Sequence, residues 1–555
     1  SDEGYDLLLS FCRDFYYSNY TEPALLIRII DILLPHYEDR SDTESLLFLY
    51  ICAGFSYMEL SRTGEPTSRD KTIYFYTKVL SYRDQIEFFE SATSRDYIFI
   101  AYYNLIRVAP GLGILDIETA YRLWEELCQI RTMPKFCQYD TTNPRIPQLC
   151  DCAINDFRAY GAVLNVERVI APSAILSSLE NMTQIYYSEI LHEHGSIYEC
   201  PVFTVFNYHY VQARNGTITW EAAWQILDDY YVHKMQTIGQ VSSPDLLAFY
   251  TNLPLNLIDV LGHTHFKEEF KQATYRRYRN LITSYLMNQP ASLNSYTLNN
   301  GVQLVAFHPL ILGTFQNRME KMNFIVDLVV TRHLTTFTHS VMVSYLAEAI
   351  GKHILAARPE LLRIPSSYLE GNVYASPAEV LDYIVPAALF HDIGKNGMIP
   401  IINTQHRKLN DYEFNIIQTH PQKGSDYLSS DPDFLIYQPV ALGHHRSYDG
   451  TRGYPLSFDN TASPYRDAID LIHICDCLDA ATDYLSRNYH RAKPFDVVLN
   501  ELKAGRGTEY NPDMVDVILS DRELYNDLKM LTEQNRENIY YDIYLTFVNL
   551  RKKRQ

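Results

Sequence analysis

The chain has 555 residues, of which 46% are hydrophobic and 21% charged, and its formal net charge is −19. This length predicts two to four domains, because single hydrophobic cores stop growing at roughly 250–300 residues. The acidic balance disfavours binding to large nucleic acids or to anionic lipid, since both require a basic surface. An anionic substrate would have to be held by local cations or by metal ions.

Composition and cysteine usage favour a cytoplasmic protein. No apolar run reaches the roughly 18–20 residues of a transmembrane helix, and no signal peptide is visible. The chain starts at Ser1 rather than Met, so the sequence does not exclude a membrane anchor ahead of this residue. The nine cysteines follow neither a disulfide pattern nor a complete zinc motif, which predicts structural thiols in a reducing compartment.

Residues 5–287 show one amphipathic helical pattern after another. Apolar residues recur at three- and four-residue spacing over 25–34, 98–106, 120–130 and 220–231. Two segments, beginning at Tyr102 and Phe206, each pair an aromatic-rich helix with a glycine turn and a second helix that carries Ala and Trp. This favours a degenerate tetratricopeptide-like array, with an irregular helical domain as the alternative.

We expect residues 1–300 to form a sensory, docking or dimerisation domain, because no catalytic pattern is found there. His192 and His194 are two positions apart, which places them on different sides of a helix and predicts surface residues. The segment from Asn288 to Gly313 has sparse apolar periodicity and many turn residues, so we expect a domain boundary there and a second domain over 315–555. The predicted fold class is all-α.

A series of histidines and aspartates in the second domain predicts a metal centre: His339, His391, Asp392, His420, His444, His445 and Asp476. Five imidazoles and two carboxylates exceed the needs of one tetrahedral zinc ion, and mixed N/O ligands suit octahedral Fe, Mn, Co or Ni. The carboxylate of Asp392 can bridge two cations, and Lys395 follows within one helical turn. Such a two-metal centre is suited to phosphoryl transfer.

Local sequence signals place these residues at helix ends. Asn410 and Glu413 predict a capping box for a helix that His420 closes. A further helix begins near Asp431 and ends at His444, and the helix of Asp476 begins at Ser463 and Pro464. Asp479, one turn after Asp476, is expected either to belong to the hydrogen-bonding surroundings of that buried carboxylate or to lie behind the ligands as a supporting partner. The helix of His339 is expected to include Val330.

Residues 323–519 resemble the HD-GYP family of bacterial HD phosphohydrolases. The resemblance is carried by His339-Ser340, His391-Asp-Ile-Gly-Lys395, His420-Pro-x-x-Gly424, His444-His445, Asp449-Gly450, Gly453-Tyr454-Pro455, Asp476, Asp479-Ala480, Arg487-x-Tyr489 and the run 507–516. It implies an all-helical domain that cleaves cyclic di-GMP to linear pGpG or GMP. Some members prefer cyclic GMP-AMP, and others have lost activity.

The resemblance also implies residue roles. His339, His391, Asp392 and Asp476 would hold one metal, and Asp392 would bridge to a second held by His420, His444 and His445. Lys395 would lie beside the scissile phosphate, and Gly453-Tyr454-Pro455 would lie near the substrate. Members with a third metal have a glutamate where this chain has Thr335, so we expect two metals, with Fe or Mn favoured over Co, Ni or Mg.

The substrate-holding residues differ from the family pattern. Arg446 stands where a glutamate is common, Arg452 is an extra residue in the Asp449–Pro455 loop, and Asp470 replaces an arginine. Candidate substrate contacts are therefore Lys395, Arg446, Asp449, Gly453, Tyr454, Pro455, Arg487 and Arg491. Arg407, Lys408 and Arg452 are further candidate cations.

Together these features predict a phosphodiesterase that hydrolyses a cyclic dinucleotide, most simply cyclic di-GMP, with a hydroxide that two metals activate. Lys395 and Asp392 are the predicted catalytic residues. One alternative is a phosphodiesterase for cyclic GMP-AMP or another nucleotide. A second is an inactive nucleotide-sensing scaffold that keeps the metals. The first domain is the candidate for homodimerisation.

Overall fold

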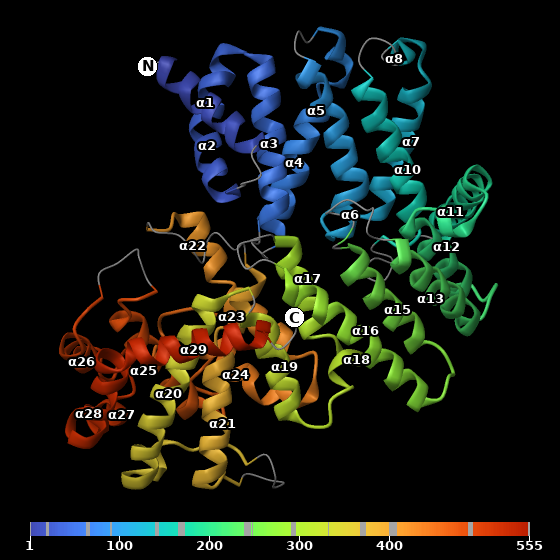
Figure 1. Ribbon diagram of the computed structural model, residues 1–555. Helices are drawn as coiled ribbons and strands as arrows, with labels where there is room; N and C mark the ends of the chain where they lie inside the picture. The colour runs from blue at the N-terminus through green and yellow to red at the C-terminus, as the bar shows by residue number, and fades with distance from the viewer. Residues whose placement is uncertain are drawn as a thin grey trace. The chain divides into compact units, whose positions relative to one another are not determined.

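The computed structural model is helical throughout the part of the chain that it describes (Figure 1). It describes residues 2–17, 22–62, 67–88, 92–138, 144–164, 173–237, 246, 248–289, 296–330, 332–366, 373–398, 408–486 and 492–552. Over these ranges there is no β-strand, and three isolated β-bridges are the only extended pairing. The predicted all-α fold class is confirmed.

The chain divides into two compact units, Ser1–Lys271 and Gln272–Gln555. The predicted domains, 1–300 and 315–555, stay a prediction, because compactness alone does not show which parts fold independently. None of the helices in the described ranges combines the length and the apolarity that crossing a bilayer requires. All nine cysteines are free thiols.

The first unit is a succession of helices that pack mainly on their neighbours in the chain (Figure 1). Its helices are α1 (Asp2–Tyr17), α2 (Pro23–Arg40), α3 (Thr43–Ser61), α4 (Ser68–Leu80), a 3-10 helix (Arg83–Phe88), α5 (Ala92–Tyr103), a π-helix (Asn104–Val108), α6 (Ala109–Gly111), α7 (Ile117–Thr132), α8 (Pro134–Cys137), α10 (Arg145–Tyr160), α11 (Ser173–His194), a 3-10 helix (Ile197–Glu199), α12 (Val202–Arg214), α13 (Trp220–Thr237), a π-helix (Ala248–Asn252) and α15 (Leu253–Gly262). Helix α16 (Glu268–Asn288) crosses into the second unit.

Large aromatic rings fill the contacts between these helices. Tyr37, Tyr76, Tyr102 and Tyr230 are fully buried, and their hydroxyls find polar partners, as when Tyr102 donates to Glu126 at 2.8 Å. A buried tyrosine needs such a partner because an unpaired hydroxyl is expensive to desolvate. The predicted helices are present, but the tetratricopeptide-like repeat stays a prediction. His192 and His194 are both exposed, as expected.

The second unit carries the predicted metal ligands. Its helices are α17 (Tyr296–Ala306), α18 (Pro309–Leu312), α19 (Arg318–Val330), α20 (Leu334–Ala357), a 3-10 helix (Pro359–Leu361), α21 (Pro377–Phe390), the 3-10 helix η7 (Ile393–Gly397), α22 (Asp411–Ile417), α23 (His420–Leu428), the 3-10 helix η9 (Pro432–Tyr437), α24 (Gln438–Gly443), α25 (Arg466–Thr482), α26 (Phe495–Ala504), α27 (Pro512–Ser520), α28 (Arg522–Lys529), a π-helix (Met530–Gln534) and α29 (Arg536–Lys552).

Helix α20 lies at the centre of this unit and packs against α21 and α25 (Figure 1). The approach of α20 to α21 is close because Gly351 has no side chain: a Cβ there would lie 2.5 Å from Cδ1 of Ile384. Buried apolar residues line α20 on several sides, including Met342, Leu346 and Ile350. The central helix therefore holds His339 inside the core.

Three expected helix boundaries were wrong. His420 does not close a helix: α22 ends at Ile417, and His420 is the first residue of α23. Pro421 explains the difference, because proline fits the first turn of a helix, where its missing N–H is not needed. Helix α25 begins at Arg466 rather than at Ser463, and Val330 ends α19 rather than belonging to α20. The capping box of Asn410 and Glu413 is confirmed.

Candidate metal centre

Five different parts of the chain bring the predicted ligands to one place. His339 comes from α20, His391 and Asp392 from the junction of α21 with η7, His420 from the start of α23, His444 and His445 from the end of α24, and Asp476 from α25. Their donor atoms form two groups, Asp392–His420–His444–His445 and His339–His391–Asp476, and within each group all atoms lie within 4.8 Å of one another. These are two buried His/Asp clusters consistent with a metal centre.

The carboxylate of Asp392 stands between the two groups. Its Oδ1 lies 3.1 Å from Nε2 of His420 and 3.6 Å from Nε2 of His444. Its Oδ2 lies 3.5 Å from Nε2 of His391 and 3.6 Å from Nε2 of His339. One oxygen therefore faces each group, which is the arrangement that a bridging carboxylate requires.

Hydrogen bonds behind the imidazoles fix which nitrogen faces the centre. Nδ1 of His391, His420 and His444 lies 2.6, 2.7 and 3.0 Å from the carbonyl oxygens of Ala388, Ile417 and Ala441. Each ring therefore donates Nδ1–H to the end of its own helix or turn, a tautomer inferred from its partner. The lone pair of Nε2 is left pointing inward, as a metal ligand needs.

The imidazole Nε2 atoms that point inward would be stabilised by a cation between them. Nε2 of His420 lies 3.1 Å from Nε2 of His444, so two lone pairs meet with no proton between them. Nε2 of His391 and Nε2 of His445 are buried with no hydrogen-bond partner. Because an unsatisfied buried acceptor costs roughly 1–3 kcal/mol, the residues present fit divalent metal ions.

The protonation states agree with this fit. Burial lowers the pKa of His391 to about 3 and that of His420 to about 4, so both rings are neutral at pH 7. Burial alone would raise the pKa of Asp392, but the Lys395 ammonium and the surrounding imidazoles outweigh it and hold that pKa well below its usual range. Neutral imidazoles and an ionised carboxylate are the forms that bind metal.

Of the two roles expected for Asp479, the structure shows the one behind a ligand. Its Oδ2 lies 2.6 Å from Nδ1 of His339, so it orients this imidazole. Asp476 Oδ1 lies 3.0 Å from Nε2 of His339 on the inner side. A carboxylate behind a metal-binding histidine is a recurring feature of metal sites, because it fixes the ring and raises its basicity.

Lys395 lies beside the bridging carboxylate. Its Nζ donates to Oδ2 of Asp392 at 2.5 Å, and its side chain is 18% exposed. His445 is 21% exposed, whereas the other imidazoles are at most 5% exposed. Tyr454 stacks near His445, with ring centroids 4.6 Å apart. Lys395, His445 and Tyr454 therefore mark the side from which the centre reaches solvent.

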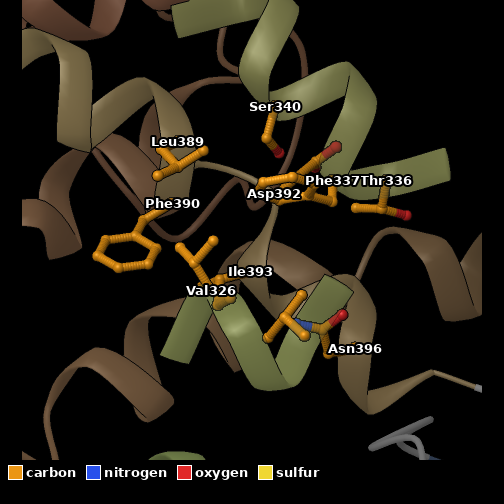
Figure 2. Close-up of a pocket in the computed structure, with 10 residues that line it drawn as sticks. Val326, Thr336, Phe337, Ser340, Leu389, Phe390, Asp392, Ile393 and Asn396 are labelled. Carbon is orange, nitrogen blue, oxygen red and sulfur yellow. The ribbon is translucent and has the colours of Figure 1, made fainter. Parts of the chain in front are cut away.

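A small cavity lies on another side of Asp392 (Figure 2). Its lining is largely apolar, with Val326, Phe337, Leu389, Phe390 and Ile393 alongside Ser340 and Asn396. It has room for about one water molecule, so a nucleotide would have to approach Asp392 from elsewhere.

The loop after His445 is shaped by hydrogen bonds of its own. Arg446 is buried, and its guanidinium donates to the carbonyl oxygens of Gly450, Arg452 and Gly453. Gly453 has φ +87°, and a Cβ there would lie 1.9 Å from the carbonyl oxygen of His445. The arginine and the glycine thus hold this loop against the end of α24.

The other predicted substrate residues differ in position. Asp449 is exposed and accepts from Ser447 and Thr451, bonds that hold the pKa of this carboxyl to about 2. Arg452 is exposed and lies 3.2 Å from Glu509, and Lys408 is exposed. Arg407, Arg487 and Arg491 lie outside the described residues. The substrate contacts predicted at Lys395, Arg446, Asp449, Gly453, Tyr454, Pro455, Arg487 and Arg491 stay predictions.

Three residues around the centre were missed by the sequence analysis. His473 donates Nδ1–H to the carbonyl oxygen of His444 at 2.6 Å, and its Nε2 lies 3.4 Å from Glu509. Arg536 forms a buried ion pair with Asp479 at 2.8 Å. A histidine one helical turn before Asp476 was the available signal for His473. Glu509 lies in the run 507–516 that supports the family resemblance, but no role was predicted for it, and nothing local in the sequence pointed to Arg536.

Comparison with known protein families identifies the part of the chain that carries this site. Residues 336–487 match the family described as HD domain, a range that contains all seven grouped residues. The chain contains an HD domain. The two groups of ligands meet at the His391-Asp392 doublet of this domain. His391 belongs to one group, and the carboxylate of Asp392 lies between both.

Relatives of the chain include cyclic dinucleotide phosphodiesterases. A cyclic di-GMP phosphodiesterase of Vibrio cholerae is 26% identical over 303 residues, 49% of this chain and 60% of the relative. A cyclic di-GMP phosphodiesterase response regulator of Xanthomonas campestris is 33% identical over 146 residues, 26% of this chain and 37% of the relative. A 3'3'-cGAMP-specific phosphodiesterase of Vibrio cholerae is 25% identical over 203 residues, 36% of this chain and 37% of the relative.

The chain thus spans between about a third and three fifths of the length of these relatives. The HD domain and its distant relatives confirm the resemblance to HD-GYP phosphodiesterases on which the sequence analysis relied.

Proposed function

We propose that the protein is a metal-dependent phosphodiesterase that hydrolyses cyclic di-GMP to pGpG or GMP. The observation that carries the proposal is the position of Asp392, whose two oxygens face two separate groups of imidazoles at 3.1–3.6 Å. Two divalent cations, which we propose are Fe or Mn, would be held there, with Co, Ni or Mg as alternatives. When bound, they would acidify water and neutralise charge on the phosphoryl oxygens.

The residues of the chain would share the remaining work. The backbone carbonyls behind His391, His420 and His444 keep their Nε2 atoms directed inward. Lys395, 2.5 Å from Oδ2 of Asp392, can place its ammonium beside a phosphate oxygen or pass a proton to a leaving oxygen. The ring of Tyr454 covers His445 and limits the access of water on the solvent side.

The substrate proposal is supported by the relatives of the HD domain, which include cyclic di-GMP phosphodiesterases. Cyclic GMP-AMP is the second candidate, because 3'3'-cGAMP-specific phosphodiesterases are also among them. We further propose that the first unit regulates the HD domain or dimerises it.

The test is turnover of both cyclic dinucleotides by protein reconstituted with Mn or Fe, with products separated by chromatography and metal content measured. We expect two ions per chain, hydrolysis of cyclic di-GMP and loss of both ions and activity in Asp392→Ala. Asp382→Ala removes an exposed carboxylate from α21, the helix that precedes Asp392, and should change neither. Bound metal and tight nucleotide binding without product would instead identify an inactive sensing scaffold. A protein that binds no metal would refute the proposal.

A further inference from the structure

A buried ion pair connects the C-terminal helix to the metal centre. Arg536 is the first residue of α29, and its side chain is 0% exposed. Its Nη1 lies 2.8 Å from Oδ1 of Asp479, which is also 0% exposed. The other oxygen of Asp479 lies 2.6 Å from Nδ1 of His339. A continuous chain of contacts therefore runs from the guanidinium to an imidazole of the metal centre.

Each link in this chain restrains the next. The remaining nitrogens of Arg536 donate to the carbonyl oxygen of Thr532 at 3.0 Å and to the hydroxyl of Thr482 at 2.8 Å. This guanidinium is held beside Asp479, and Asp483 lies farther away, with its Oδ1 3.7 Å from the same Nη1. The carboxylate of Asp479 is fixed by this contact, and it accepts Nδ1–H from His339. Nε2 of His339 is thereby left as the ligand atom.

The helix that carries Arg536 also packs on the helix that carries His339. Ile539, Tyr540 and Ile543 of α29 form an apolar cluster with Met342 of α20. Leu334 and Phe337, just before His339, pack against the same cluster. Movement of α29 away from α20 would therefore withdraw the guanidinium and expose this end of the central helix at the same time.

The two ligand groups differ in how they are supported. In the group of Asp392, both His420 and His444 donate Nδ1–H to backbone carbonyls close to them in sequence. In the group of Asp476, His339 depends on a side chain, Asp479, and through it on a residue of α29. Loss of α29 contacts should therefore affect the second group more than the first.

We propose that Arg536 is a positioning residue for His339 and that docking of α29 controls metal retention in the His339–His391–Asp476 group. The inference rests on the proposed two-metal centre and is independent of which nucleotide the protein cleaves. It makes the C-terminal helix a structural element through which one of two metal sites can be loaded or emptied.

The test compares the full chain with three variants by metal content and by titration with Mn. Arg536→Met removes the guanidinium and keeps a long apolar side chain. Asp479→Asn combined with Arg536→Met removes this ion pair as a whole, while Asp483, whose Oδ1 lies 3.7 Å from the same Nη1, keeps its hydrogen bonds from Leu485 and Ser486. Tyr540→Phe is the matched control, because it deletes a hydroxyl 3.3 Å from the same guanidinium without touching Asp479. Thermal unfolding in chelator reports the fold of each metal-free variant.

We expect two ions in the wild type and in Tyr540→Phe. Arg536→Met should bind the first ion with unchanged affinity and the second 10–100-fold more weakly, the usual effect of losing a residue behind a ligand. The double variant should regain part of the thermal stability in chelator, because Asp479 is no longer a buried charge without its partner, yet keep the weak second site. Recovered stability together with a weak second site would show that Arg536 positions His339 and does more than stabilise the fold.

Two results would overturn the inference. One is Arg536→Met binding both ions with wild-type affinity. The other is equal weakening of both ions in Arg536→Met with full recovery of both in the double variant, which would make the arginine a folding residue only. A wild type that binds no divalent ion would instead refute the metal centre, and the inference with it.

Discussion

Gly394 and His420 touch through their backbones. A Cβ on Gly394 would lie 2.0 Å from the carbonyl oxygen of His420 and 2.5 Å from the amide nitrogen of Gly424. These are backbone atoms that cannot rotate away, so η7 and the first turn of α23 can approach this closely only when position 394 is glycine. The contact sets the distance between Asp392 at one side of η7 and His420.

Gly394→Ala should therefore disturb the centre itself. Overpacking typically destabilises a protein by 1–3 kcal/mol, and here the shift must move η7 away from α23. We expect urea unfolding to show a loss of roughly that size and metal analysis to show weaker binding in the Asp392–His420–His444–His445 group. Gly111→Ala is the control, since a Cβ there would meet its nearest atom at 3.6 Å. Wild-type metal content in Gly394→Ala would contradict the prediction.

Lys395→Gln should separate catalysis from metal binding. The ammonium donates to Asp392 at 2.5 Å, and its removal takes away a positive charge that competes with metal for the same carboxylate. We expect both metals to be retained and kcat to fall about 10²–10³-fold, as when a charge-stabilising donor is lost. Steady-state kinetics with metal analysis measures both effects. Lys352→Gln, an exposed lysine that pairs with Glu348, should behave as wild type.

The seven grouped residues could be predicted from the sequence because ligand chemistry and spacing occur together in short motifs. The partners behind them could not. The sequence leaves two roles open for Asp479, beside Asp476 one turn away on α25 or behind another ligand, and it cannot show that Asp479 faces His339 on α20. Which side of α25 meets α20 is decided by packing between helices that are far apart in sequence. Arg536 was missed for the same reason.

Local signals also determined how well helix ends were predicted. The capping box of Asn410 was recognised because its residues are three apart and bond each other directly. Pro421 was taken as a stop signal, although proline is equally suited to the first turn of a new helix. Only the position of His420 against Gly394 distinguishes the two, and that contact is tertiary. The inward orientation of Arg446 likewise depends on the folded loop.

Asp470 should make the protein less stable as pH rises. Burial raises the pKa of this carboxyl from 3.8 to about 7, with Asn511 and Arg466 offsetting part of the effect. Its stabilising, protonated form is fully present below pH 4 and is lost as pH rises through 7. One pKa unit corresponds to 1.36 kcal/mol, so the difference amounts to at most about 4 kcal/mol.

Asp470→Asn should remove this dependence, because the amide oxygen can still accept from Asn511. Urea unfolding at pH 5 and pH 8 should show the variant gaining stability over wild type mainly at pH 8. Asp459→Asn is a control in which stability should change in the opposite direction. Hydrogen bonds from Thr461 and Ala462 lower the pKa of Asp459, so this variant should lose stability at pH 8. Equal pH dependence in wild type and Asp470→Asn would be inconsistent with the assignment.

Removal of metal by a chelator should destabilise the second unit, because the imidazole nitrogens of the metal centre then have no cation to bind. Without a cation, the lone pairs of His420 and His444 meet at 3.1 Å, and Nε2 of His391 and of His445 lacks a partner. Free metal at 100 times its Kd should restore about 2.7 kcal/mol. Unfolding in EDTA, followed by titration with Mn, measures the change. His420→Ala should shrink the response, whereas replacing the exposed His192 and His194 by alanine should leave it intact. An unfolding curve that EDTA does not shift would exclude metal as a stabilising partner of this centre.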